Sequence, residues 1–289
     1  MAEVGLVAFA ECALDIAKRV MPLYRSKFSK HTFTQPQLLA ILCLMRLEDW
    51  TFRETEVRLR EHSDLRRALC LSQTPDFTTF YRLMQRLDVQ VIQLALQEAA
   101  LQVLKGQPAS KTVFAVDAIG LAPGAMSTFF IHRKRDRGQG LPWRYWLKWV
   151  VAVETKHQLL LAQIAKRGPC NDCALLRPLL DIAHRVMPAR CVLADAEFDS
   201  ERNHKHIRQV HHLDSVIPAK RGKSTWHLKG VRAMMRAHFP AKKYRQRNLI
   251  ETVFSVVKRK LSTRAPGRSL AAQSSQALVL GLAYNLYRF

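Results

Sequence analysis

The chain has 289 residues, of which 48% are hydrophobic, a content typical of a globular protein with a buried core rather than of a disordered chain. The longest apolar runs, LLAILCLM and ALVLGLAY, are too short for a membrane-spanning helix, and the N-terminus lacks a basic leader, so the sequence predicts a cytoplasmic protein without a membrane segment. A net charge of +23 indicates a polyanionic partner, because lysine and arginine bind phosphates and release counterions.

The first hundred residues have the apolar spacing of short helices joined by turns. Thr34 with Gln37, and Thr51 with Glu54, have the spacing of capping boxes, so a helix is predicted to follow each pair. The predicted helices are residues 3–28, QLLAILCLMRLE, TFRETEVRLREH, SDLRRALCL, TTFYRLMQRL and VQVIQLALQEAALQVLK. This pattern suits an all-α helix-turn-helix-like module, with a helical bundle that only supports dimerisation as the alternative.

The segment GQPASK combines glycine, proline and serine and is the best domain boundary in the chain. We predict an α-helical DNA-binding or dimerisation domain over residues 1–108 and a second domain over residues 109–289. Residues 1–110 hold 14 lysines and arginines against 12 acids, and residues 111–289 hold 32 against 11. The second domain therefore carries nearly all the positive charge, and an acid inside one of its apolar runs requires a partner.

Beyond the boundary the periodicity changes from helix to strand. TVFAVDAIGLAP, STFFIHR and YWLKWVVAVET are rich in β-branched and aromatic residues and predict three adjacent antiparallel strands. A helix over 171–186, a strand CVLADAEF, a helix over 199–212, a strand DSVIPA and further helices are predicted to follow. This order predicts the α/β fold class, with helices layered on a mixed sheet.

Two aspartates end apolar runs of this domain, and a glutamate lies on a later helix. Asp117 follows VFAV and Asp195 follows CVLA, at positions where an unpaired carboxylate costs several kcal/mol. Alone, each suits a turn cap or a local ion pair, and Glu251 in YRQRNLIETVFSVVK suits a solvated helix face. Together, the three carboxylates suit two Mg²⁺ ions roughly 3.5–4 Å apart, an arrangement that drives in-line displacement at a phosphodiester.

The helix with Glu251 also carries cations and a hydroxyl on the same side. In a regular α-helix Tyr244, Arg247 and Lys258 project within roughly 60° of Glu251. We expect Arg247 and Lys258 to neutralise phosphates of DNA near the scissile bond, and Tyr244 to hydrogen-bond one of them.

These residues carry a resemblance to a known family. Tyr244, Arg247, Glu251 and Lys258 match the Tyr-x2-Arg-x3-Glu-x6-Lys signature of a group of DDE transposases of prokaryotic insertion sequences. Asp117 in FAVDAIGL and Asp195 in LADAEFDS resemble the first two acids of that family, from which the chain departs at Glu197 and at Ala118-Ile119. The resemblance extends from about Gln35 to the C-terminus.

The resemblance implies an RNase H-like catalytic domain and a Mg²⁺-dependent enzyme that cuts and joins DNA. Asp117, Asp195 and Glu251 would bind two Mg²⁺ ions, for which Mn²⁺ can substitute. Water would cleave the end of the element, and the exposed 3′-OH would attack target DNA. The implied partners are terminal inverted repeats, target DNA and a second copy of the chain, at the nucleoid of a prokaryote. Another RNase H-like nuclease and a catalytically silent DNA-binding relative are the alternatives.

Further candidate DNA contacts are basic segments, each weighed against a solvated turn or helix face. They are Arg82 and Arg86 in TTFYRLMQRL, Arg133, Lys134 and Arg135 in HRKRDR, Lys220 and Arg221 in KRGK, and Lys242 and Lys243. Trp143, Trp146 and Trp149 can stack on bases, but packing in the strand core is favoured. For His204, His206, His211 and His212 a polar helix surface is favoured over a metal site, because no acid or cysteine has a matching spacing.

Overall fold

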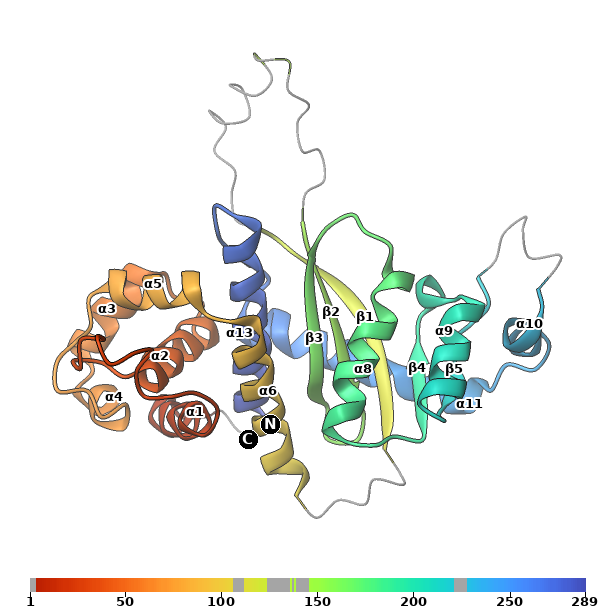
Figure 1. Cartoon of the computed structure of the whole chain (residues 1–289), viewed down its shortest axis with the longest axis horizontal. Helices are drawn as coiled ribbons and strands as arrows, with labels where there is room; N and C mark the ends of the chain where they lie inside the picture. The colour runs from red at the N-terminus through yellow and green to blue at the C-terminus, as the bar shows by residue number, and fades with distance from the viewer. Residues whose placement is uncertain (1–3, 106–111, 124–135, 137, 139–145, 221–227) are drawn as a thin grey trace.

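A five-stranded sheet lies on one side of two central helices, α6 (Val89–Leu104) and α13 (Leu270–Tyr287), and a group of helices lies on the other side (Figure 1). The structure is a computed structural model that describes residues 4–105, 112–123, 136, 138, 146–220 and 228–289. The strands are β1 (Val113–Leu121), β2 (Leu147–Glu154), β3 (Leu159–Arg167), β4 (Cys191–Ala194) and β5 (Asp214–Val216), in the sheet order β3-β2-β1-β4-β5. The predicted mixed α/β architecture is confirmed.

The sheet consists of an antiparallel half and a parallel half. β1 pairs antiparallel with β2, and β2 with β3, whereas β4 lies parallel to both β1 and β5. The third antiparallel strand is β3, which was not predicted from the sequence. The strand predicted in STFFIHR lies outside the described residues. The strand predicted over CVLADAEF is wrong beyond Ala194, because the Asp195 side chain accepts a hydrogen bond from the Ala196 N–H and starts a 3₁₀ turn.

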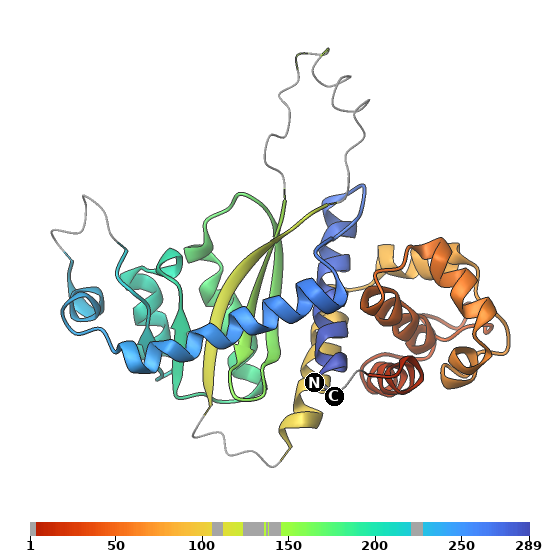
Figure 2. The ribbon, with the colours of Figure 1, turned by 180° about the vertical axis from the view of Figure 1, so that it is seen from behind.

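Helices cover both faces of the sheet. α8 (Leu176–Val186) and α9 (Glu201–Lys205), which continues as a π-helical turn (His206–Val210), cover the front face in Figure 1. A long rod crosses the other face (Figure 2) and consists of α11 (Ala241–Tyr244), a 3₁₀ turn (Arg245–Arg247), α12 (Asn248–Val256) and a π-helical turn (Val257–Leu261). α10 (Gly230–Ala237) packs against α9.

Successive side chains along β1 project to opposite faces of the sheet. Phe114 and Val116 belong to the apolar cluster beneath α8, whereas Ala115 belongs to the cluster that contains Ile250 and Val253 of α12. Because strand side chains alternate with a period of two, Asp117 projects toward α12. The sheet therefore separates α8, on its front face, from α12, which carries Glu251 on the other face.

The remaining helices form a group beside the sheet and follow the predicted order, except that the helix predicted over residues 3–28 ends at Val20. Both predicted capping boxes are confirmed, since the side chains of Thr34 and Thr51 accept from the backbone N–H three residues on. In return, the backbone N–H of each threonine donates to the side chain of Gln37 or Glu54. The helices are α1 (Leu6–Val20), α2 (Gln35–Leu47), α3 (Phe52–Glu61), α4 (Ser63–Ala68), α5 (Phe77–Arg86), α6 (Val89–Leu104) and α13 (Leu270–Tyr287). Within the described parts of the chain, none of the helices is both long and apolar enough to span a membrane.

α13 joins the two sides of the molecule. It is buried from Ala272 to Tyr287 on nearly every side, and it packs against α2 and α6 of the helical group and against β3 of the sheet. Asn285 accepts from the Leu160 N–H and donates to the carbonyls of Leu160 and Leu96. One apolar cluster therefore extends from α1 and α2 to the sheet. The predicted boundary at residues 108 and 109 lies outside the described residues.

Candidate active site

The two aspartates singled out in the sequence lie at the same level of the sheet, one on β1 and one directly after the parallel strand β4. Val116 of β1 pairs with Ala194 of β4, so the next residue of each chain segment, Asp117 and Asp195, occupies the same level of the sheet. Asp117 lies in the middle of β1 rather than at its end, because β1 continues its pairing with β2 as far as Leu121. Each aspartate accepts a hydrogen bond from the next residue's N–H through Oδ1, at 2.8 Å for Asp117 and 2.5 Å for Asp195.

Arg247 lies at the centre of the three carboxylates. Its Nη2 atom is 2.7 Å from Asp117 Oδ2 and 3.6 Å from Asp195 Oδ2, and its Nη1 atom is 3.0 Å from Glu251 Oε1. The Arg247 and Asp117 side chains are only 12% and 16% exposed, whereas those of Asp195 and Glu251 are 44% and 61% exposed. The structure therefore brings all three acids to one cation, in a site that is closed behind Asp117 and open to solvent beside Glu251.

Burial and charge act against each other in this site. Burial raises the pKa of the Asp117 carboxyl above its ordinary value, and the Arg247 guanidinium only partly offsets that effect. Burial lowers the pKa of Arg247, but the Asp117 carboxylate and the weaker influence of Tyr244, Asp195 and Glu251 outweigh it, so the pKa is raised overall. The guanidinium is therefore held charged, and Asp117 depends on a cation to stay ionised.

The other two residues of the signature, Tyr244 and Lys258, lie on the same helical rod, which is not uniformly α-helical. The prediction of one regular helix from Tyr244 to Lys258 is wrong, since the rod contains a 3₁₀ turn and a π-helical turn. Tyr244 packs edge-on against Phe239 with ring centroids 4.9 Å apart, and burial raises its pKa. Lys258 is exposed on the π-helical turn, where a spacing of 100° per residue no longer applies.

The three carboxylates form a donor set that suits a divalent cation with a preference for oxygen. Carboxylates without histidine or cysteine are the protein ligands that Mg²⁺ and Mn²⁺ accept. Asp117, Asp195 and Glu251 already converge on one positive group, Arg247, whose guanidinium occupies the position that a metal cation of the same charge sign could take. The exposed oxygens of Asp195 and Glu251 leave an approach from solvent.

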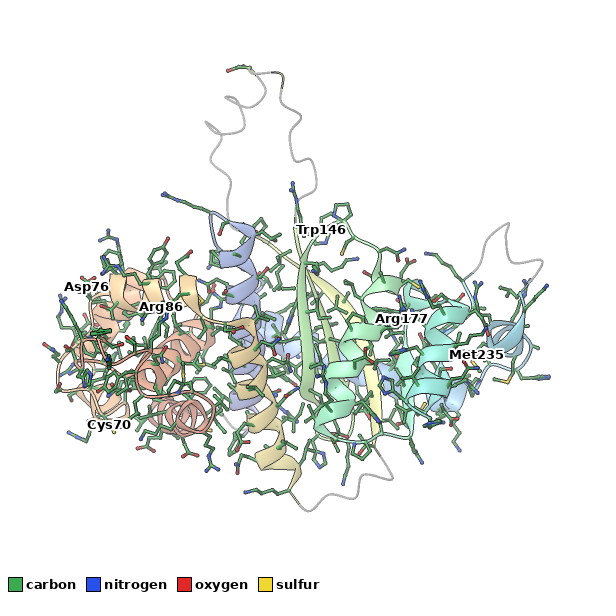
Figure 3. All side chains as sticks on the ribbon, viewed as in Figure 1. Cys70, Asp76, Arg86, Trp146, Arg177 and Met235 are labelled. Atoms are coloured by element: carbon green, nitrogen blue, oxygen red, sulfur yellow. The ribbon has the colours of Figure 1, made fainter. Side chains whose placement is uncertain are left out.

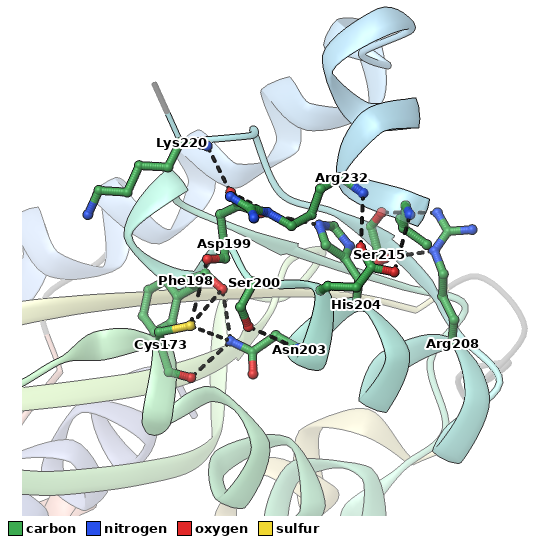
Figure 4. Close-up of polar contacts among 12 residues, drawn as sticks. Cys173, Phe198, Asp199, Ser200, Asn203, His204, Arg208, Ser215, Lys220 and Arg232 are labelled. Carbon is green, nitrogen blue, oxygen red and sulfur yellow. Dashed lines mark hydrogen bonds and ion pairs between the residues drawn. The ribbon is translucent and has the colours of Figure 1, made fainter. Parts of the chain in front are cut away.

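A buried network that sequence reasoning did not identify supports the turn after Asp195 (Figure 4). The Asp199 carboxylate accepts from the Lys220 N–H at 2.9 Å and from Arg232 Nη2 at 2.7 Å, and its Oδ1 lies 3.6 Å from His204 Nε2. Burial raises the Asp199 pKa, but these partners outweigh it and lower that pKa to about 2. The network fixes the start of α9 and with it the backbone that follows Asp195. In the sequence, the network is marked only by Asp199, an acid four positions after Asp195.

The basic segments are distributed between the helical group and the sheet. Arg86, which is labelled in Figure 3, and Arg82 are exposed on α5. They line a groove of about 350 Å³ together with Arg25 and Lys30. Lys220 is exposed, and its ammonium contacts Glu197 at 2.7 Å. The remaining predicted contacts of this kind, Arg133, Lys134, Arg135 and Arg221, lie outside the described residues. Of the additional pair, Lys243 contacts Asp214 at 2.7 Å and Lys242 is exposed.

Of the three candidate tryptophans, Trp149 lies in the core, whereas Trp146 is partly buried. Trp149 is fully buried, and its indole N–H donates to Gln163 Oε1 at 3.0 Å, so it is not free to stack on a base. Trp146 lies over Gly120 and Gly168 at the start of β2 (Figure 3). Trp143 lies outside the described residues.

The histidines differ from the prediction of a polar helix surface, which is wrong for three of the four. His204 is fully buried and its Nδ1 lies 2.7 Å from Ser215 Oγ. His206 and His211 both contact Asp181 of α8, an acid from another helix that spacing within the local sequence could not reveal. His212 is exposed and has a positive φ of 56°.

Comparison with known proteins identifies the family. A search of curated proteins found no match to the chain. One solved structure with similarity is a cryo-EM structure of a piggyBac transposase synaptic complex with hairpin DNA, with a TM-score of 0.47 and 10% identity over 98% of this chain and 74% of that chain. Residues 108–286, more than half of the chain and all three converging acids, match the family model described as a transposase DDE domain. The chain therefore belongs to the transposase DDE domain family.

Proposed function

We propose that the protein is a transposase that cuts DNA at the ends of an insertion sequence and joins the resulting 3′-OH ends to target DNA. The observation that carries the proposal is the convergence of Asp117, Asp195 and Glu251 on one cation. A sheet of three antiparallel strands followed by two parallel ones, with acids on β1 and directly after β4, supports an RNase H-like fold for this domain. The match over residues 108–286 supports the same reaction class.

Asp117, Asp195 and Glu251 are proposed to hold two Mg²⁺ ions, with Mn²⁺ as a substitute. When bound, such ions activate the attacking oxygen and stabilise the leaving oxygen of an in-line phosphoryl transfer. Asp117 holds its place through the β1 ladder and its bond to the Ala118 N–H. Asp195 and Glu251 expose their carboxylates to solvent, where a phosphodiester can approach.

The cations around the site are proposed to bind the DNA backbone. Arg247 bonds to the acids through both Nη atoms, and a cation bound by these acids would release its guanidinium toward a phosphate. Lys258 and Lys220 are exposed on elements beside the acids and supply further phosphate contacts. In the helical group, Arg82 and Arg86 with their basic groove form a separate DNA contact. Terminal inverted repeats, target DNA and a second copy of the chain are the proposed partners.

The test uses the full chain, a duplex that ends in the inverted repeats bracketing its coding sequence, and a second duplex as target. With Mg²⁺ we expect cleavage at the repeat and a joined product. Asp117→Asn, Asp195→Asn and Glu251→Gln should each lower cleavage by at least about a thousandfold while DNA binding is retained, because each removes a charge but little volume. Glu61→Gln, in an exposed acid of α3, is the matched control and should cleave normally.

The outcomes separate this proposal from its alternatives. Full cleavage by Asp195→Asn would exclude the assignment of the acids. Cleavage without any joined product would favour an RNase H-like nuclease. DNA binding without cleavage in either Mg²⁺ or Mn²⁺ would favour a silent relative that only binds DNA.

A further inference from the structure

Two histidines and an aspartate converge on the front layer of the sheet, away from the proposed catalytic acids. His206 Nε2 lies 2.7 Å and His211 Nε2 lies 2.8 Å from the same oxygen, Asp181 Oδ1. The potential ligand atoms of these residues all lie within 4.8 Å of one another. The His206 and His211 side chains are 17% and 10% exposed, and that of Asp181 is 43% exposed, so the cluster is covered by protein on one side and open on the other.

The backbone has an irregularity at this point that brings the two imidazoles together. In a regular α-helix, residues five positions apart project about 140° away from each other. The segment His206–Val210 is instead a π-helical turn, closed by the hydrogen bond from the His211 N–H to the His206 carbonyl at 3.3 Å. The two rings therefore lie next to each other, with centroids 4.9 Å apart. Single π-helical turns are rare and often occur at functional sites.

A third imidazole borders the cluster. The ring centroid of His184 lies 4.6 Å from that of His211, and His184 is three residues after Asp181 on α8. Its Nδ1 atom is buried and has no hydrogen-bond partner among the described residues. His184 is not within ligand distance of the other three, but its ring lies beside them and can supply a polar wall or, after rotation, a further donor.

We propose that Asp181, His206 and His211 bind a divalent transition-metal ion of the Zn²⁺ class. Two imidazoles and a carboxylate are ligands that Zn²⁺ accepts at about 2.0–2.2 Å, which corresponds to ligand atoms about 3.3 Å apart in a tetrahedron. The present N···O separations are hydrogen-bond distances, so loading requires an opening of about half an ångström. Each ring must also bind as a neutral imidazole, so its Nε2 proton moves to Nδ1 of the same ring or, from an imidazolium, to solvent. A water molecule or His184 completes the coordination.

The donor set and the position distinguish this site from the carboxylate site. Mg²⁺ prefers oxygen ligands and disfavours imidazole, so the two sites select different ions. α8 and Ile207 of the π-helical turn pack on the face of the sheet that carries Phe114 and Val116, whereas Glu251 lies on α12 across the sheet. A bound ion would tie α8 to the helix that begins directly after the Asp199 network, and so would brace the turn that follows Asp195.

The test measures metal binding directly and does not depend on DNA cleavage. The tag-free, metal-stripped full chain is dialysed against Zn²⁺ in excess Mg²⁺, and bound zinc is counted by elemental analysis. We expect one Zn²⁺ per chain, a visible Co²⁺ absorption band typical of four-coordinate nitrogen and oxygen ligation, and a rise of about 5 °C in the thermal midpoint at a hundredfold excess over the dissociation constant. Absence of zinc uptake by the unmodified chain would overturn the proposal without any variant.

Matched variants assign the bound ion to its ligands. His206→Gln, His211→Gln and Asp181→Asn should each lose the bound Zn²⁺ and its thermal shift while retaining the far-ultraviolet circular dichroism of the parent. His157→Gln is the control, because His157 also contacts a carboxylate, that of Glu154 at 3.0 Å, but without a second histidine. Asp195→Asn should retain the zinc. Equal zinc uptake by His211→Gln, or its loss in Asp195→Asn, would contradict the site.

Discussion

At the scale of single residues, Arg247 is the cation that the three acids share. Its guanidinium contacts Asp117 most closely, and Asp117 is the most buried of the three carboxylates. A partly buried carboxylate without a cation loses more hydration energy than it regains, so the arginine stabilises the fold around Asp117. The Arg247 guanidinium and a metal ion would compete for these acids, because an ion can bind them only when the guanidinium moves away.

Removing this arginine should therefore create a stability defect that depends on pH. The folded-state pKa of Asp117 is raised, so the folded protein holds a proton that the unfolded chain has released, and stability falls as pH rises through that window. Arg247→Gln should raise this pKa further, costing about 2–3 kcal/mol near neutral pH and less at acidic pH, where protonation of Asp117 removes the unpaired charge. Urea unfolding across this range measures the difference.

Arg245→Gln is the control for that experiment, because Arg245 is exposed in the same 3₁₀ turn. Millimolar Mg²⁺ should reduce the defect of Arg247→Gln, since a bound cation replaces the guanidinium. A defect that is independent of pH and of Mg²⁺ would show that Arg247 acts through packing instead.

The residue scale also shows the limit of sequence reasoning. The relation of Arg247 to Glu251 is a local i,i+4 pair and could be predicted, whereas its contact with Asp117 spans 130 positions and could not. In the same way, His206 and His211 are close in the sequence, but Asp181 lies 25 and 30 positions from them on another helix. Spacing within one segment reveals only partners that the same segment supplies.

At the scale of elements, local signals predicted the helices well and the strands less completely. The capping boxes of α2 and α3 are local hydrogen-bond patterns and are visible in the sequence. β3, LLLAQIAKR, is rich in leucine and alanine, which favour helices, and its strand state comes from pairing with β2 and from burial beneath α13. Tertiary contacts therefore override propensity at β3.

α12 offers a test of how an element positions the site. Ile250 is fully buried, directly precedes Glu251 and belongs to the cluster that contains Ala115 and Val151 of the sheet. Ile250→Ala should cost about 2–4 kcal/mol of unfolding free energy, because it leaves a cavity beneath the helix. We also expect DNA cleavage to fall more steeply than the folded fraction, as Glu251 shifts with its helix.

The control for this prediction is Thr252→Ala, which changes an exposed residue on the other side of Glu251. It should leave both unfolding and cleavage close to those of the parent. Parent-like cleavage by folded Ile250→Ala would mean that the position of Glu251 does not depend on this packing.

At the scale of the whole molecule, α13 makes the helical group and the sheet one cooperative unit. Gln163 of β3 accepts from the Trp149 indole and donates to the Leu278 carbonyl of α13 at 2.9 Å. Gly281 lies against these groups, and a methyl group there would overlap the Gln163 amide and the Trp149 ring. A glycine is required because the helix and the sheet approach each other so closely.

Gly281→Ala should accordingly destabilise the whole protein, although alanine is the better helix former. We expect a loss of about 1–3 kcal/mol, because the added methyl group forces a buried amide out of its hydrogen bonds. Calorimetry should show a single transition shifted to lower temperature. Ala271→Ser, at the exposed start of α13, is the control and should unfold like the parent. Two separate transitions in either protein would contradict a shared core.

The position of α13 in the chain also governs when a newly made molecule can become active. The apolar faces of α2, α6 and β3 all pack on a helix that follows every one of them in the sequence. A ribosome releases its product from the N-terminus at about 5–20 residues per second, so these faces emerge well before the segment that covers them. A nascent chain therefore completes its fold only after α13 leaves the ribosome, and incomplete translation products present exposed apolar surface to chaperones rather than an assembled set of acids to DNA.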